Sequence, residues 1–231
     1  MALPAAPVVA AGEFRGFPPD ALDFFAELEA NNDRTWWLAN RPRFEESVRG
    51  PMRTMLDRLE PAFGPFRVFR INRDVRFSKD KSPYKTAHGA TAETAGGSLH
   101  YVQISASGLL IGAGVYHAMR DQITRWRTAV ADDARGPGAE RAIAAVRSAG
   151  LDVTAGAEPP LTGAPRGVDR DHPRIELLRW KGCAATQDLG APAWLHTRRA
   201  AERVAAAWAK AAPLVAWLDE NVGPSELPPD R

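Results

Sequence analysis

Apolar residues recur every three or four positions in several stretches, the spacing that buries one face of an α-helix. The N-terminal third holds three such stretches. One begins after Pro18-Pro19, a short one follows Asp33, and a longer one starts near Pro42. Asp33 is a good N-cap residue, and Gly50-Pro51 is expected to bend the third helix. Further helices are predicted over about 118–132, 139–149, 174–180 and 204–222.

The period changes to two in residues 66–78, which predicts a β-strand. The odd positions from Phe69 to Phe77 form an apolar face interrupted by Arg73, while the even positions are polar. A buried arginine would need a carboxylate or a ligand as partner, because an unpaired charge in the core is costly. The alternative is a turn or bulge at 72–74 that places the three arginines of this segment on one side.

Residues 100–116 are expected to form a β-hairpin with its turn at 106–108. One face of the second strand consists of four residues, Leu110, Gly112, Gly114 and Tyr116. Alternating glycines leave a flat strip that a helix, a backbone or a ligand can approach closely. Gly112 and Gly114 do not form a dinucleotide-binding fingerprint, because the third glycine of that motif is missing.

These elements predict an α+β fold, with a mostly antiparallel sheet flanked by helices, in a single domain of about residues 14–222. Residues 1–13 are rich in Ala and Pro and lack the basic start of a signal peptide, so we expect a disordered lead. Pro213 is expected to divide the last helix. Gly223 should end it, and the tail 223–231 should fray.

Composition narrows the class of protein. The chain has 231 residues, and no stretch approaches the ~18 apolar residues that span a bilayer, so we expect no membrane insertion. Cys183 is the only cysteine, which excludes an internal disulfide and a cysteine-based zinc site and favours a cytoplasmic location. No cofactor or metal is expected, because the five histidines lack metal-site spacing and the chain has no P-loop and no G-x-S-x-G elbow.

Positive charge is concentrated in one segment. Residues 70–85 carry a local charge of +4, although the whole chain is only +2. Three of the five lysines fall within seven residues there, in a chain that otherwise uses arginine. Lysine offers a compact point charge where arginine offers a planar fork, so we expect at least one of these lysines, Lys81 above all, to point inward near Tyr84. A solvated charge run is the alternative.

The segment Arg70–Tyr84 follows the pattern RxxRDxRFxxxDKxxY. Four further patterns accompany it: NNDRxWW at 31–37, GxGxYH at 112–117, PRGxDxDHP at 165–173 and PLVxWL at 213–218. On these motifs the chain resembles DUF2461, a conserved hypothetical family of about this length, over most of its sequence. The resemblance implies no reaction, substrate or cofactor.

The residues themselves suit an oxyanion, because arginines and lysines bind phosphate and carboxylate groups. A second polar set, which includes Asp169 and Lys181, is expected to approach the first. The catalytic candidates are His172, Lys81 and Tyr84. The ligand-binding candidates are Arg70, Arg73, Arg76, Lys79, Lys81, Tyr84, Lys85, His117, Arg166, Asp171 and His172.

We therefore expect a pocket for a small anionic ligand built on residues 70–85, and whether it is catalytic stays open. One alternative is nucleic-acid binding, with phosphate contacts and stacking on Phe69, Phe77 and Tyr84. It is disfavoured because the basic run is short and the rest of the chain is net acidic. Another alternative is a non-catalytic structural or interaction protein, in which the Arg/Asp motif is a salt-bridge network.

Overall fold

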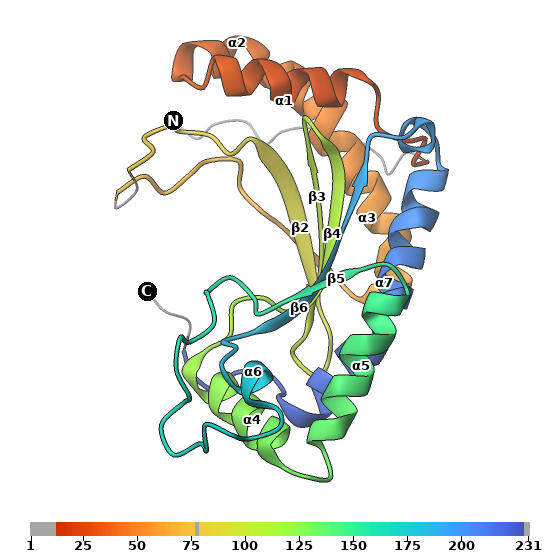
Figure 1. The fold of residues 1–231 in the computed structure, drawn as a ribbon. Coiled ribbons are helices and arrows are strands. Elements are labelled where there is room, and N and C mark those ends of the chain that lie inside the picture. The colour runs from red at the N-terminus through yellow and green to blue at the C-terminus, as the bar shows by residue number, and fades with distance from the viewer. Residues whose placement is uncertain (1–12, 77–78, 229–231) are drawn as a thin grey trace.

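A computed structural model describes residues 13–76 and 79–228, and an antiparallel sheet forms its centre (Figure 1). The strands lie in the order β1-β2-β3-β4-β6-β5. Their bounds are β1 Phe66–Val68, β2 Ala87–Glu93, β3 Leu99–Ser105, β4 Gly108–Val115, β5 Asp152–Thr154 and β6 Cys183–Gly190. The expected α+β class with a mostly antiparallel sheet is confirmed, and the hairpin of β3 and β4 lies where the alternating pattern predicted it.

Helices cover only one face of this sheet. Figure 1 shows α3 (Gly50–Phe63), α5 (Gly136–Ser148) and α7 (Arg199–Asn221) on that face. Two groups of helices lie at the ends of the sheet: α1 (Asp20–Ala30) and α2 (Arg34–Phe44) at one, and α4 (Arg120–Ala131) and α6 (Ile175–Leu178) at the other. A π-helical turn, η1 (Glu45–Arg49), joins α2 to α3, and a 3₁₀ turn, η2 (Ala193–His196), precedes α7.

The covered face forms the core. His100, Val102 and Ile104 of β3 point into it, and the intervening residues of that strand are only half-buried. The fully buried indole of Trp208 on α7 lies at its centre, where it packs on the rings of Phe63 and His100. The opposite face of β3 and β4 carries no helix (Figure 1).

The helix boundaries follow local chemistry. The side chain of Asp33 accepts hydrogen bonds from the backbone N–H groups of Thr35 and Trp36, as expected of an N-cap. The disturbance expected at Gly50-Pro51 takes the form of η1, because a proline cannot donate the helical hydrogen bond to the preceding turn. Pro213 does not divide α7, contrary to our prediction: it lies on the exposed side of the helix, which continues to Asn221.

Two other predictions need correction. Regular strand structure in residues 66–78 ends at Val68, and residues 77–78 lie outside the described range. The expected fraying after Gly223 is wrong for the first part of the tail. There Gln122 binds the Gly223 carbonyl, and Asp121 accepts hydrogen bonds from Ser225 and from the backbone of Glu226. The lead 1–13 lies outside the described residues except for Glu13.

No helix within residues 13–76 and 79–228 is both long and apolar enough to cross a membrane. The absence of an apolar run in the sequence had led us to expect this.

His88 on β2 introduces a polar ring into the core. It is 3% exposed, meets the ring of Phe44 edge-on, and neither ring nitrogen has a hydrogen-bond partner among the described residues. Burial, with the positive charges of Arg49 and Lys85, lowers the pKa of His88 to about 4 from its ordinary 6.5. The folded protein therefore holds this imidazole in its neutral form.

We predict that His88 makes the protein sensitive to acid. Its folded pKa lies below its unfolded pKa, so its neutral form favours folding above pH 6.5, and this stability is lost as the pH falls toward 4. His88→Leu should remove on the order of 2 kcal/mol of that pH dependence. Urea unfolding at pH 7.0 and about pH 4.5 measures it, with the exposed-residue variant His117→Gln as control. Equal losses in wild type and His88→Leu would contradict the prediction.

Candidate functional site

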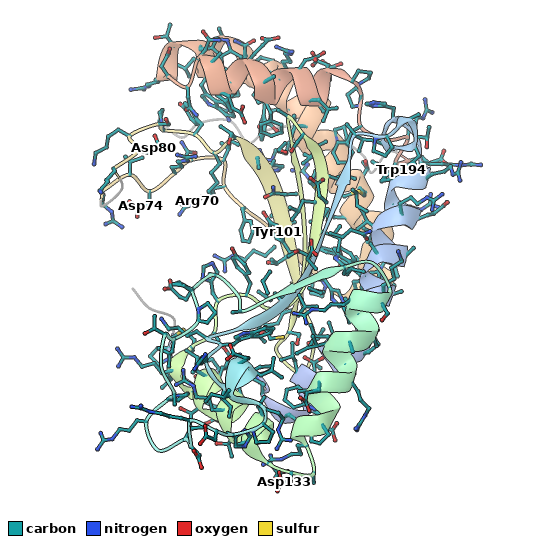
Figure 2. The ribbon with its side chains drawn as sticks, in the orientation of Figure 1. Arg70, Asp74, Asp80, Tyr101, Asp133 and Trp194 are labelled. Carbon is teal, nitrogen blue, oxygen red and sulfur yellow. The ribbon has the colours of Figure 1, made fainter. Side chains whose placement is uncertain are left out.

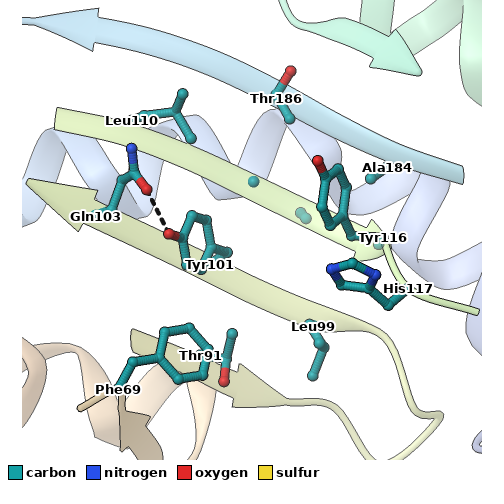
Figure 3. A pocket seen from close by; sticks show the side chains of 13 residues that line it. Phe69, Thr91, Leu99, Tyr101, Gln103, Leu110, Tyr116, His117, Ala184 and Thr186 are labelled. Carbon is teal, nitrogen blue, oxygen red and sulfur yellow. Dashed lines mark hydrogen bonds between the residues drawn. The ribbon is translucent and has the colours of Figure 1, made fainter. Parts of the chain in front are cut away.

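The uncovered face of the sheet contains a cavity of about 480 Å³. Cross-strand partners in the sheet register define its floor: Thr91, Tyr101, Gly112 and Thr186 form one row, and Leu99, Gly114 and Ala184 form the next. Other lining residues include Phe69, Gln103, Leu110, Tyr116 and His117. The lining therefore combines apolar and aromatic groups with hydroxyls, an amide and one imidazole, and it contains no carboxylate, lysine or arginine (Figure 3).

The glycine face expected from the sequence is this floor. Gly112 and Gly114 of β4 both line the cavity, and a side chain added at Gly112 would lie between those of Tyr101 and Thr186. Gly114 has a φ of 121°, and an added Cβ would lie 2.5 Å from the Cys183 carbonyl oxygen, so the backbone itself requires glycine there. The strip thus lacks side chains at two positions of the cavity floor, which a ligand can approach closely.

Tyr101 forms the most polar part of the floor. Its hydroxyl donates a 2.6 Å hydrogen bond to the side-chain amide oxygen of Gln103 (Figure 3). Burial, and to a smaller extent the nearby Tyr116, raises the pKa of the phenol. Its ring lies over Gly89 of β2, where a Cβ would come within 2.9 Å of the hydroxyl. Tyr101 is therefore a neutral hydrogen-bonding group held toward the β2 side.

A basic arm, described over residues 69–76 and 79–86, extends from the β1 end of this face (Figure 1). Its two halves meet through backbone hydrogen bonds, in which the Arg73 N–H donates to the Pro83 carbonyl and the Lys85 N–H donates to the Ile71 carbonyl. Phe69 lines the cavity, and the Lys85 ammonium lies 5.5 Å from the centre of its ring. The arm therefore brings positive charge to the rim of an uncharged cavity.

Ion pairs occupy the outer part of the arm. Arg73 pairs with Asp80, and Arg76 pairs with Asp74 at 2.6 Å. The hydrogen bond from Arg76 holds the pKa of Asp74 at about 2, and hydrogen bonds from Ser82, followed by Arg73, do the same for Asp80. These contacts fit the alternative of a structural Arg/Asp network.

A family model described as a conserved hypothetical protein (DUF2461) matches residues 20–217. The chain belongs to the DUF2461 family. No curated protein and no solved structure matches it.

Two of the DUF2461-like motifs meet at the base of the arm. The side chain of Asn32 accepts a hydrogen bond from the Tyr84 backbone N–H at 3.1 Å and donates one to the Tyr84 carbonyl at 2.9 Å. The rings of Trp37 and Tyr84 stack with centroids 4.5 Å apart. Tyr84, expected at the site, is instead a buried residue that fastens the arm to α2 and does not line the cavity.

The DUF2461 segment PRGxDxDHP lies elsewhere. It belongs to the loop between β5 and α6, which Figure 1 places at the far end of the uncovered face from the arm. His172 bonds to the Ala131 carbonyl, and its Nδ1 accepts the backbone N–H of Arg174. Arg166 and Asp171 are exposed. The expected meeting of this loop with residues 70–85 is therefore wrong, because its contacts hold it to the C-terminal end of α4.

Arg174, which the sequence did not single out, makes that attachment. Its guanidinium is 7% exposed and donates to the carbonyls of Val130, Ala131 and Asp132 and to the carboxylate of Asp133. The last carbonyls of an α-helix lack partners within the helix, and a cation also suits that end of the helix dipole. Arg174 therefore acts as a C-terminal cap.

The remaining candidate residues lie in different surroundings. His117 lines the cavity, where its ring meets that of Tyr116 edge-on. Lys81 does not point inward as expected: it is exposed, and its ammonium donates to the Val75 carbonyl at 2.9 Å. Lys79 is exposed, and Lys85 is the half-buried lysine of the cluster.

Thr91 and Thr186 were missed because strands β2 and β6 lack an apolar alternation and went unpredicted, and Gln103 was missed because it is a polar position on the outer face of the predicted hairpin. No group of three or more His, Cys, Asp or Glu side chains in the described part of the chain is arranged to hold a metal ion.

We predict that Arg174 matters more for stability than Arg73. Arg73 is 31% exposed and its partner Asp80 54%, so Arg73→Ala should cost about 1 kcal/mol or less. Our first interpretation, a buried Arg73, would have made it much larger. Arg174→Ala leaves buried carbonyls without a donor and should cost on the order of 3 kcal/mol. Urea unfolding compares the two, and a larger loss from Arg73→Ala would refute this assignment.

Proposed function

We propose that the protein binds a small organic anion, with the apolar body of the ligand in the sheet cavity and its phosphate or carboxylate group at the base of the basic arm. The observation that carries this proposal is the double role of Phe69, which lines the cavity and lies beneath the Lys85 ammonium. Phe69 therefore contacts both the apolar cavity and the cationic group of Lys85.

The cavity supports the apolar half of the proposal. Ligand sites are concave, mostly apolar and equipped with a few placed polar groups, and about 480 Å³ lies within their usual range. An ion entirely inside this lining would meet no opposite charge. The charged part of a ligand therefore belongs at the rim.

Unpaired positive charge at the arm supports the anionic half. Lys85 forms no ion pair, and Arg70 forms neither an ion pair nor a hydrogen bond, with any residue that the structure describes. Burial lowers the pKa of Lys85, and the positive charges of Arg70 and Arg73 lower it further. An anion bound there would relieve this repulsion. Figure 2 shows Arg70 and Tyr101 on the same uncovered side of the sheet.

The ion pairs of the arm favour a structural role for its outer part, which is our second candidate. On that interpretation the arm has only a structural role, and a ligand of the cavity needs no charged group. Nucleic-acid binding remains an alternative as well. It predicts an affinity that falls steeply with salt, whereas a single anionic contact predicts a shallow dependence.

We predict that naphthylhexanoate, an apolar ring linked to a carboxylate, raises the thermal unfolding midpoint and that its primary amide does so far less. Lys85→Met should weaken carboxylate binding about tenfold or more, because a charge-assisted contact is lost. Calorimetric titration at several salt concentrations measures the affinity and its salt dependence.

The control is Lys79→Met, which removes the same charge from an exposed position of the arm and should leave binding nearly unchanged. Equal effects of the two variants would favour general electrostatic attraction. If neither the carboxylate nor phosphate-bearing analogues bind the wild type, the proposal fails and the structural interpretation of the arm prevails.

A further inference from the structure

We propose that the ligand is elongated, with a flat aromatic ring lying on Gly112 and an anionic group reaching Lys85 at the opposite end. This inference rests on the proposed function and specifies the chemical class of the ligand. The observation that supports it concerns Gly112, a glycine that the backbone conformation does not require.

Gly112 has no positive φ. A Cβ built there would meet the Ala185 carbonyl oxygen and the Tyr101 Cβ at 3.6 Å and the Thr186 methyl at 3.8 Å, all ordinary van der Waals distances. Alanine would therefore fit without strain, unlike at Gly114. The side chain missing at Gly112 leaves space in the cavity that only a ligand uses.

The shape of that space favours a flat ring. Gly112 lines the cavity in register between Tyr101 of β3 and Thr186 of β6, so the space left by its missing side chain is a narrow slot between the side chains of these two residues. The Tyr101 ring leans away over Gly89 and leaves the slot open. A planar ring is thin enough to enter this slot, whereas a puckered saturated ring is thicker.

The floor of the slot is held from the core side. The Trp208 indole N–H lies 3.2 Å from the Tyr101 carbonyl oxygen and 3.1 Å from the Gly112 carbonyl oxygen, and donates to both. Trp208 is 1% exposed on the long helix α7. A buried anchor of this kind keeps the slot from collapsing in the absence of ligand.

Charge sets the direction of the ligand. Asp188 is the register partner of Leu110, and Asp152 is the partner of Thr186, so both carboxylates belong to the uncovered face near its β5–β6 end. They disfavour an anion there, whereas Arg70 and Lys85 lie at the β1 end. Lys85 precedes β2 and its ammonium lies over Phe69, so the ring and the anion should occupy opposite ends of the cavity.

The test compares three carboxylates by calorimetric titration: naphthylhexanoate, the same compound with a fully saturated ring system, and the short naphthylacetate. We expect wild type to bind naphthylhexanoate about tenfold or more tightly than either of the others. Gly112→Ala should fold normally and abolish the preference for the flat ring, because its methyl group occupies the slot. Gly163→Ala, at an exposed loop position with nothing within 4 Å, is the matched control.

The outcomes separate the two proposals. If flat and saturated rings bind wild type equally, the inference about the ring is overturned, and this comparison does not depend on the folding of any variant. Unchanged affinity of folded Gly112→Ala overturns it as well. If Lys85→Met still weakens binding in either case, the proposed function stands. Failure of all three carboxylates to bind wild type overturns both.

Discussion

The indole of Trp208 is the interaction on which the rest of this structure depends. It lies fully buried on α7, and its N–H bonds to backbone carbonyls of both β3 and β4. Packing α7 on this face buries Val102 and Ile104 of β3 and Leu109 and Ile111 of β4. The other side of the two strands carries Leu99, Tyr101, Gln103, Leu110 and two glycines, which line the cavity. A single asymmetric packing choice thus creates both the core and the cavity.

The basic arm depends on a second set of contacts, at the edge of the sheet. Asn32 binds both backbone groups of Tyr84, and Trp37 stacks on its ring, so α2 determines where the arm leaves the domain. Ion pairs within the arm neutralise its outer part. Lys85 and Arg70 form no ion pair with any described residue, and the Lys85 ammonium lies over Phe69, which lines the cavity. The chemistry of the arm therefore follows from how it is anchored more than from its net charge.

Local patterns predicted elements whose stability is local. Asp33 is a cap by its own side chain, and the hairpin of β3 and β4 alternates because one face of it is buried. The pattern failed at residues 69–76. These residues alternate with period two, but they belong to an arm that folds back on itself and is held by irregular backbone hydrogen bonds. It also failed at β6, whose sequence CAATQDLG is small and polar because one side of the strand faces the cavity.

For the candidate site, the sequence by itself determined the glycine strip of β4 and the concentration of charge in residues 70–85. Both are properties of consecutive residues, which a single chain reveals. Only the tertiary structure decided that Phe69 joins them, that His172 and Arg166 lie elsewhere, and that Lys81 points outward. Those facts depend on which side chains find partners across the fold, such as Arg174 at the end of α4. Partners distant in the chain leave no periodic trace in it.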